Sequence, residues 1–331
     1  PMNIRFLIRS AERHDLESLM RLAPQALLVN LPPDEDILAI KIARSLQAFS
    51  ANPPPSAEYL FVLEDVASGE VVGTSQIIAR CATPQTPHYF FEVRDTSRGQ
   101  ELTLGVRTGG LSAIGGLVLD RRYRAMPEKR GKQISLIRFE FMGMQPQRFE
   151  PTVLSELMTP VAPDGSNRFW DALGGRFTGM RYAEAFALTR QKSRDFIPRH
   201  FPAAPICLPA DGRGLQCNRD QVLESGKPEQ RILEKVGFSY CRRVDPMDGA
   251  LHYEAPLAEI SIVKNGRFCR VSQTDRASCP QSALLGFMRG DRFFGGQYPV
   301  RVNGVKAALP GEVMALLGLA SGEEIYLSLL A

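Results

Sequence analysis

The feature that most constrains the fold is a mostly apolar run, Ala113–Asp120, which is followed by a basic loop and a helical pattern. A continuous apolar run of this length is typical of a strand buried on both faces. Its paired glycines, Gly115 and Gly116, would weaken a regular strand, so they indicate a β-bulge or a close approach of the backbone to another group. This stretch therefore predicts a strand around which the rest of the chain is organised.

The loop after this strand carries six cations within twelve residues. A helix is expected from about Gln133, because Ile134, Ile137 and Phe141 fall on one face. The N–H groups and the positive dipole end of such a helix favour an anion. A solvated surface turn is the alternative, but a diphosphate with a further phosphate, as in coenzyme A, would use several cations. The six are Arg121, Arg122, Arg124, Lys129, Arg130 and Lys132.

Composition places the chain among ordinary globular proteins of one large domain or two moderate ones, since 331 residues are 44% hydrophobic and 23% charged. The net charge of +4 suits an anionic small ligand, but no Lys/Arg run extends beyond the loop, so nucleic-acid binding is not expected. No apolar run approaches ~18 residues, so no membrane span is expected.

The six cysteines form no C-x-x-C pair, which predicts free thiols in a reducing cytoplasm and no zinc site.

The rest of the chain alternates between helical and strand patterns. Asp34 is expected to cap a helix over residues 35–49, and Gly237 to end a helix over residues 227–236. A short helix over residues 167–174 is expected to end at its own glycine, Gly174. Further strands are expected at 4–9, 59–65, 70–80, 88–94, 152–158 and 206–208, and further helices at 11–22, 182–189 and 193–196.

The character of the sequence changes near Glu259. From there, short β-like runs such as 260–263 and 298–302 alternate with glycine-rich turns. We therefore expect a first domain over residues 1–255 and a small β-rich domain over residues 256–331.

A family pattern is spread over nearly the whole chain. It is carried by Leu31-Pro32, Phe61–Asp65, Leu117–Asp120, Tyr123-Arg124, Phe169-Trp170 with Leu173-Gly174, Leu233–Phe238, and Asp245 with Asp248-Gly249. The order of elements resembles the GNAT-type acyl-CoA N-acyltransferases, and these segments are similar to the arginine N-succinyltransferase family. The resemblance implies an α+β fold with a mixed, largely antiparallel central sheet flanked by helices, and a small C-terminal β-rich domain.

The resemblance also implies an activity. The expected reaction is transfer of an acyl group, succinyl in this family, from acyl-CoA to the amine of arginine, ornithine or a related amino acid. Succinyl-CoA or another acyl-CoA would be the co-substrate, with no tightly bound cofactor and no metal. The enzyme would be cytoplasmic, and a homo-oligomer or a hetero-oligomer with a paralogue. A non-catalytic acyl-CoA-binding subunit, regulatory or structural, is the alternative.

The chain departs from the family pattern on the side that would hold the acceptor. Val106–Gly110 stands where the family usually carries Asn-Asp-His-Thr-Gly, and Ala113 stands where a glutamate follows. A second family histidine falls at Leu223, and the loop keeps only Gly131 of two glycines. These replacements predict that arginine is succinylated weakly or not at all.

Acyl transfer to an amine requires removal of a proton and stabilisation of an oxyanion. His88 and His200 are candidates for the base, and His14 and His252 rank below them, although a lone histidine is more often a surface or core residue. Tyr240 is a candidate acid for the leaving thiol, with a packed strand tyrosine as the alternative. In the superfamily that this chain resembles, strand N–H groups line the thioester. The alternative is that the paired glycines only permit close packing. The acyl-CoA-binding candidates are Gly116, Leu117, Leu119, Arg124, Lys129, Arg130, Gly131 and Lys132.

Overall fold

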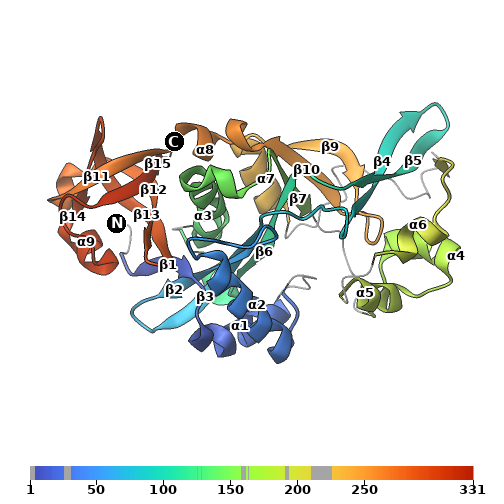
Figure 1. Cartoon of the computed structure of the whole chain (residues 1–331), viewed down its shortest axis with the longest axis horizontal. Coiled ribbons are helices and arrows are strands. Elements are labelled where there is room, and N and C mark those ends of the chain that lie inside the picture. The colour runs from blue at the N-terminus through green and yellow to red at the C-terminus, as the bar shows by residue number, and fades with distance from the viewer. Residues whose placement is uncertain are drawn as a thin grey trace. The chain divides into compact units, whose positions relative to one another are not determined.

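The computed structural model describes residues 4–25, 31–124, 126–127, 129–157, 162, 164–190, 194–209 and 226–330 (Figure 1). The chain forms two compact units. The first unit consists of Pro1–Ala79, Ala113–Pro151 and Pro256–Ala331, and the second of Arg80–Ser112 and Thr152–Ala255. The chain leaves the second unit after Ala255 and re-enters the first unit at Pro256, which is where the sequence predicts a domain boundary. The division into independent domains 1–255 and 256–331 stays a proposal.

The strands of the first unit follow one another in the order β12, β15, β11, β14, β13, β1, β2, β3 and β6. Every pairing for which the register is known is antiparallel, except the parallel pair β11 and β14. The strands are β1 (Phe6–Ser10), β2 (Glu58–Asp65), β3 (Glu70–Ile78), β6 (Leu111–Leu119), β11 (Arg267–Thr274), β12 (Gln281–Arg289), β13 (Arg292–Asn303), β14 (Lys306–Pro310) and β15 (Glu324–Leu329).

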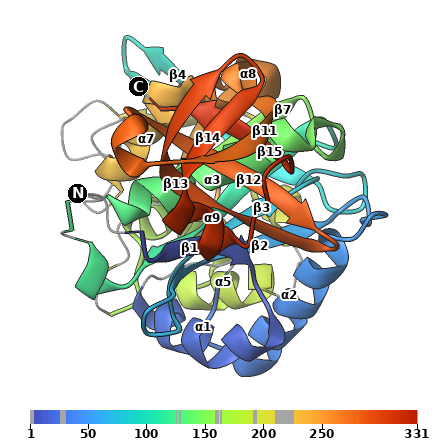
Figure 2. The same ribbon diagram turned by 90° about the vertical axis from the view of Figure 1, so that its left-hand side faces the viewer.

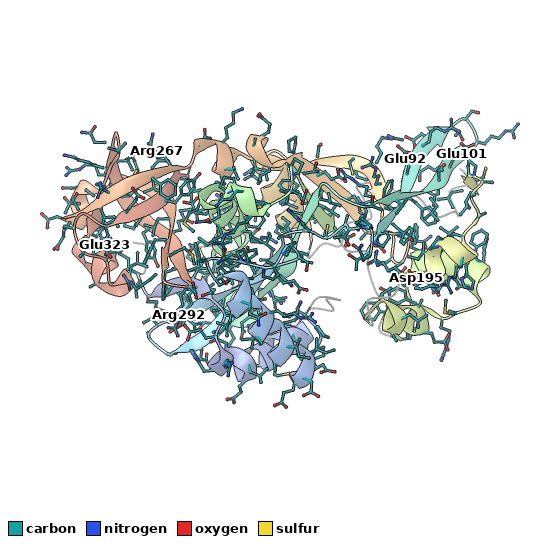
Figure 3. The ribbon with its side chains drawn as sticks, viewed as in Figure 1. Glu92, Glu101, Asp195, Arg267, Arg292 and Glu323 are labelled. Atoms are coloured by element: carbon teal, nitrogen blue, oxygen red, sulfur yellow. The ribbon has the colours of Figure 1, made fainter. Side chains whose placement is uncertain are left out.

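Five C-terminal strands close into a ring, because β12 also pairs with β13. Figure 2 shows these strands facing the viewer. Their interior is filled by apolar side chains, among them Val271, Leu285, Val300 and Leu327. This confirms the expected β-rich C-terminal part. The ring is joined to the N-terminal strand by the pairing of β1 with β13, and Arg292 (labelled in Figure 3) forms an ion pair with Glu12 at 3.1 Å.

Two helical layers cover the sheet of the first unit. Helices α1 (Leu16–Leu22) and α2 (Glu35–Ala48) bury Leu19, Leu38 and Ile42 against apolar residues of β2 and β3. Asp34 Oδ1 accepts the N–H of Ile37 at 3.1 Å, so the predicted helix cap is confirmed. Helix α3 (Arg130–Met144) packs Phe141 among the rings of Phe49, Tyr59, Phe61, Phe149 and Phe293.

The remaining helices of the first unit are short. They are η1 (Arg13–Asp15), η2 (Ala23–Gln25), η3 (Arg121–Tyr123), η4 (Pro146–Arg148), η7 (Leu257–Glu259), α8 (Ser261–Asn265), η8 (Arg276–Ser278) and α9 (Gly311–Leu317). Within the described residues, no helix has the length and apolar character that crossing a membrane requires.

The second unit is built on the strand order β7, β10, β9, β4, β5 and β8. The hairpin of β4 and β5, on which Glu92 and Glu101 are labelled in Figure 3, is paired along its full length. The strands are β4 (His88–Thr96), β5 (Gly99–Arg107), β7 (Thr152–Leu157), β8 (Ile206–Pro209), β9 (Ser239–Val244) and β10 (Leu251–Pro256). The helices are η5 (Trp170–Gly174), α4 (Gly175–Thr178), α5 (Tyr182–Arg190), α6 (Phe196–His200) and α7 (Lys227–Val236).

Several local predictions were wrong. The helix expected to stop at Gly174 continues to Thr178, and Gly179, at φ +69°, follows its last turn. The run 260–263 is not a strand: Ser261–Asn265 is helical, and Ser328 donates a hydrogen bond to the Ile262 carbonyl at 3.0 Å. The helix predicted over residues 193–196 does not end at Phe196, because α6 runs from Phe196 to His200 and includes Pro198. Strand β5 was not predicted. Ser193, the first residue of one predicted helix, and Met158, the last residue of one predicted strand, lie outside the described residues.

Candidate functional site

Strand β6 contains a β-bulge at its paired glycines. Thr74 faces Val118 and Gln76 faces Gly115, so β6 holds one more residue than β3 between these pairs. Gly116 lies at φ +58°, and a Cβ there would come within 3.0 Å of the Gln76 Cβ. Thr74 Oγ1 donates a 2.7 Å hydrogen bond to the Gly116 carbonyl. The bulge is thus fixed by a side chain, and one of the two interpretations of the glycines is confirmed.

A buried arginine connects helix α3 to the bulged strand. Arg138 has no exposed surface, and its Nη1 donates to the carbonyl oxygen of Gly115 at 3.4 Å. Its Nε donates to the Ser135 carbonyl at 2.8 Å and its Nη2 to Ser135 Oγ at 2.7 Å. These contacts hold α3 at a fixed position against β6.

The loop between β6 and α3 is organised by Asp120. Its carboxylate accepts the Arg122 N–H at 3.0 Å and pairs with the Arg122 guanidinium, which holds the Asp120 pKa below its usual range. Arg124 Nε donates to the Leu119 carbonyl at 2.8 Å while the side chain stays exposed. Lys129 precedes α3 in the left-handed region, at φ +49°, and is exposed. Arg124 and Lys129 therefore present charge to solvent beside the start of α3.

Arg130 points the other way. It is 2% exposed, its guanidinium lies 4.1 Å from the centre of the Phe6 ring, and its Nη1 donates to Gln133 Oε1 at 3.0 Å. Lys132 and Gly131 are half-buried in the first turn of α3. A Cβ at Gly131 would meet only Leu119 Cδ2, at 3.6 Å, so packing within the chain does not require glycine at this position.

The second unit brings together two histidines and a glutamate from three strands. His252 Nε2 on β10 lies 3.4 Å from Glu156 Oε1 on β7, and His88 Nε2 on β4 lies 3.8 Å from the same oxygen. His88 is 9% exposed and His252 1%, whereas 35% of the Glu156 side chain is exposed. Burial lowers the pKa of His88 to about 4, so this imidazole is neutral at pH 7. Burial would raise the Glu156 pKa, but His252 above all holds it well below its usual range.

An ion pair accompanies this cluster. Arg194 Nη1 donates to Asp245 Oδ2 at 2.8 Å, and Asp245 Oδ1 accepts the Met247 N–H at 2.7 Å. Burial, followed by the charge of Asp245, raises the pKa of Asp248 to about 8. Arg194 thereby offsets negative charge that is buried in the turn between β9 and β10.

The predicted catalytic residues have different surroundings. His88 belongs to the cluster with Glu156 and His252. His200 is exposed at the end of α6, where its Nδ1 lies 2.8 Å from the Phe196 carbonyl. Tyr240 on β9 is half-buried, with its ring centre 6.1 Å from that of Tyr253.

The stretch Val106–Gly110, which stands in place of the family's polar run, contains a residue that forms an ion pair. Arg107 on β5 forms an ion pair with Glu254 at 3.0 Å. Leu223, the other replaced position, lies outside the described residues.

The sequence alone did not indicate Glu156 and gave His252 a low rank, because no spacing links three residues from strands so far apart in the chain.

Comparison with known proteins gives the family. Residues 6–262 match the family described as arginine N-succinyltransferase beta subunit. The chain belongs to the arginine N-succinyltransferase family. Two similar relatives are the arginine N-succinyltransferases of Enterobacter sp. (strain 638), 31% identical over 292 residues and 84% of each chain, and of Photorhabdus laumondii, 30% identical over 282 residues and 81% of each chain.

A solved structure supports the same assignment. The arginine/ornithine succinyltransferase subunit AI of Pseudomonas aeruginosa is 25% identical, and the match covers 99% of both chains with a TM-score of 0.81. The predicted family and the predicted α+β acyltransferase fold are thereby confirmed. Members of the arginine N-succinyltransferase family are acyl-CoA N-acyltransferases, and this chain is a CoA-dependent N-acyltransferase of that family.

Proposed function

We propose that this chain transfers a succinyl group from succinyl-CoA to the amine of arginine, ornithine or a related amino acid. The observation that carries the proposal is the bulge at Gly116, because it interrupts the pairing of β6 directly before a basic loop and a helix start. A thioester needs backbone N–H groups that are not used up by a neighbouring strand. The names of the relatives, which specify arginine or arginine and ornithine, support the acceptor class.

In this proposal the two ends of the CoA thioester are held by different backbone segments. The acyl end lies along Gly116, Leu117 and Leu119, whose N–H groups stabilise the oxyanion as the amine attacks the thioester carbonyl. The C–S bond then breaks, and the amine proton and the thiolate leave separately. The phosphates lie at the start of α3, where the dipole and N–H groups face them.

The charge around the phosphates comes from only part of the predicted set. Arg124 and Lys129 are exposed at the loop, and Lys132 is half-buried in the first turn. Arg130 has its guanidinium against Phe6 and Gln133, so we assign it to anchoring α3 rather than to the phosphates. The catalytic base stays unassigned, because the lowered pKa of His88 makes this imidazole a weak proton acceptor, and His200 is exposed with its Nδ1 beside the Phe196 carbonyl. Tyr240 stays a candidate for the acid that protonates the leaving thiol.

The alternative is a non-catalytic acyl-CoA-binding subunit. The observation that favours it is the replacement of the family's polar run by Val106–Gly110, where Val106 is 52% exposed and Arg107 is occupied by Glu254. The words "beta subunit" and "subunit AI" in the descriptions of relatives support a hetero-oligomer with a paralogue. A cytoplasmic location remains part of the proposal.

Thiol release from a panel of acyl-CoA thioesters, with arginine, ornithine, lysine and other amines, tests the proposal. We expect release with succinyl-CoA that depends on a basic amino acid, and an N-succinyl product by mass spectrometry. Calorimetric titration of succinyl-CoA, run in parallel, separates the alternatives. Binding without turnover on every amine would support the non-catalytic subunit. The absence of both binding and turnover would refute the enzyme and the non-catalytic subunit alike.

A further inference from the structure

The cluster of His88, Glu156 and His252 has no role in the proposed acyl transfer. Each of the three residues offers one possible ligand atom, and these three atoms all lie within 4.8 Å of one another. Neither Nε2 atom makes a hydrogen bond of ordinary geometry within the described part of the chain, although both are buried. A buried nitrogen without such a bond is costly unless another ligand occupies it.

We propose that His88, Glu156 and His252 bind a divalent transition-metal ion, of which zinc is the representative. Two imidazole nitrogens and one carboxylate oxygen are one of the ligand sets found in three-ligand zinc sites, and they also suit iron(II) and cobalt(II). Three protein ligands leave a further coordination position open. The 35% exposure of the Glu156 side chain gives water or a small ligand access to it.

The distances favour a metal ion over an ammonium group. Ligands about 2.0–2.1 Å from a tetrahedral zinc ion lie roughly 3.3–3.4 Å apart. Acceptors that surround an ammonium nitrogen at about 2.8 Å lie roughly 4.6 Å apart. The observed separations from Glu156 Oε1, 3.4 Å to His252 and 3.8 Å to His88, are nearer the first value.

The charges nearby leave room for a cation. Arg194 is an arginine whose charge acts on Glu156, and it is paired with Asp245 at 2.8 Å. Because that pair is neutral as a whole, the charge of Glu156 is not cancelled by it. A divalent ion would meet one free carboxylate and two imidazoles.

The test uses the full chain without a histidine tag. After chelation and dialysis, the protein receives zinc and is exchanged into metal-free buffer, and bound metal is measured by mass spectrometry. Cobalt(II) reports the geometry through its visible absorption. We expect one ion per chain and strong absorption of four- or five-coordinate cobalt. Glu156→Gln and His252→Asn should each weaken zinc binding by at least about 10–100-fold.

Matched controls distinguish this site from adventitious binding. His200→Asn removes an exposed histidine, and Cys207→Ser removes an exposed thiol; both variants should bind zinc as the wild type does. Glu156→Gln alters a partly exposed side chain, so its fold should survive, which circular dichroism can verify. Zinc should raise the thermal unfolding temperature of wild type but not of Glu156→Gln.

Three results would overturn the proposal. They are a wild type that retains no metal, a control variant that loses zinc binding, and a Glu156→Gln variant that binds zinc as the wild type does. If instead Glu156→Gln abolishes binding of ornithine or arginine and zinc never binds, the cluster is an amine site. The outcome is independent of acyl transfer, since the readout is metal and not turnover.

Discussion

Thr74 and Gly116 face each other across the bulge of β6, and the threonine hydroxyl donates a 2.7 Å hydrogen bond to the glycine carbonyl. Both residues are buried. The bond holds a left-handed residue inside a strand, at φ +58°, where any Cβ would meet Gln76. This one contact connects the fold of β6 to the proposed position of the thioester.

Gly116→Ala should therefore impair both stability and acyl-CoA turnover. An alanine in the left-handed region costs about 1–2 kcal/mol, before its contact with Gln76 is counted. We expect urea unfolding to show a loss of at least that size, and the KM for acyl-CoA to rise. Gly109→Ala is the control, because no heavy atom lies within 4 Å of a Cβ there. Equal stability of the two variants would contradict this account of the bulge.

The loop cations should contribute to CoA affinity. Lys129→Ala combined with Lys132→Ala should weaken CoA binding at least about tenfold, since a hydrogen bond to a charged group contributes roughly 1.5–3 kcal/mol and 1.4 kcal/mol is a factor of ten. Isothermal titration of CoA measures the effect. Unchanged affinity in the double variant would favour the solvated turn that the sequence also allowed.

Arg130 and Gly131 provide the matched contrast. Arg130→Met removes the contacts with Phe6 and Gln133, so it should lower the unfolding temperature while the Kd for CoA changes less than in the lysine variant. Gly131→Val has space within the chain, where its Cβ would meet only Leu119 Cδ2 at 3.6 Å. It should reduce CoA affinity by crowding the phosphate. A reversed pattern, with Arg130 governing affinity, would refute the assignment.

Glu140 should make stability fall with pH. It lies fully buried in α3, and burial raises its pKa from 4.5 to about 8. Between these values the folded chain keeps a proton that the unfolded chain has lost. The free energy of unfolding should therefore decrease as pH rises from about 5 to 8, by up to roughly 1.4 kcal/mol per pH unit from this group, and level off above 8.

Urea unfolding from pH 5 to 9 measures that slope. Glu140→Gln should flatten it and should stabilise the protein at pH 8. Glu92→Gln, at the exposed position labelled in Figure 3, should leave the slope as it is. A parallel decline in wild type and Glu140→Gln would assign the pH dependence to other groups.

Arginine should be a poor acceptor. Val106–Gly110 lacks the histidine and the amide that the family pattern carries there, and Arg107 is paired with Glu254. We expect kcat/KM for arginine to fall at least tenfold below that of a better amine in the panel. Side-by-side assays with an ordinary family member set the scale. Turnover of arginine equal to that reference would show that these positions do not control the acceptor.

Local patterns in the sequence were sufficient for much of the fold. Strand β6, its bulge, the caps at Asp34 and Gly237, and the β-rich C-terminal part follow from residue type and short spacing. These features depend on neighbours within a few residues, which a sequence displays directly. The family pattern added the α+β acyltransferase fold. The errors at Gly174 and at residues 260–263 arose where packing overrode local preference, as at Ile262, which is buried beside Ser328.

Only the tertiary structure decided which charged groups are available and which side chains meet. Six loop cations look equivalent in sequence, yet Arg122 pairs with Asp120 and Arg130 turns inward to Phe6, because direction depends on the surface that α3 buries. His88, Glu156 and His252 come from three strands far apart in the chain and converge in the second unit. Pairing between distant strands sets such meetings, and no local pattern encodes it.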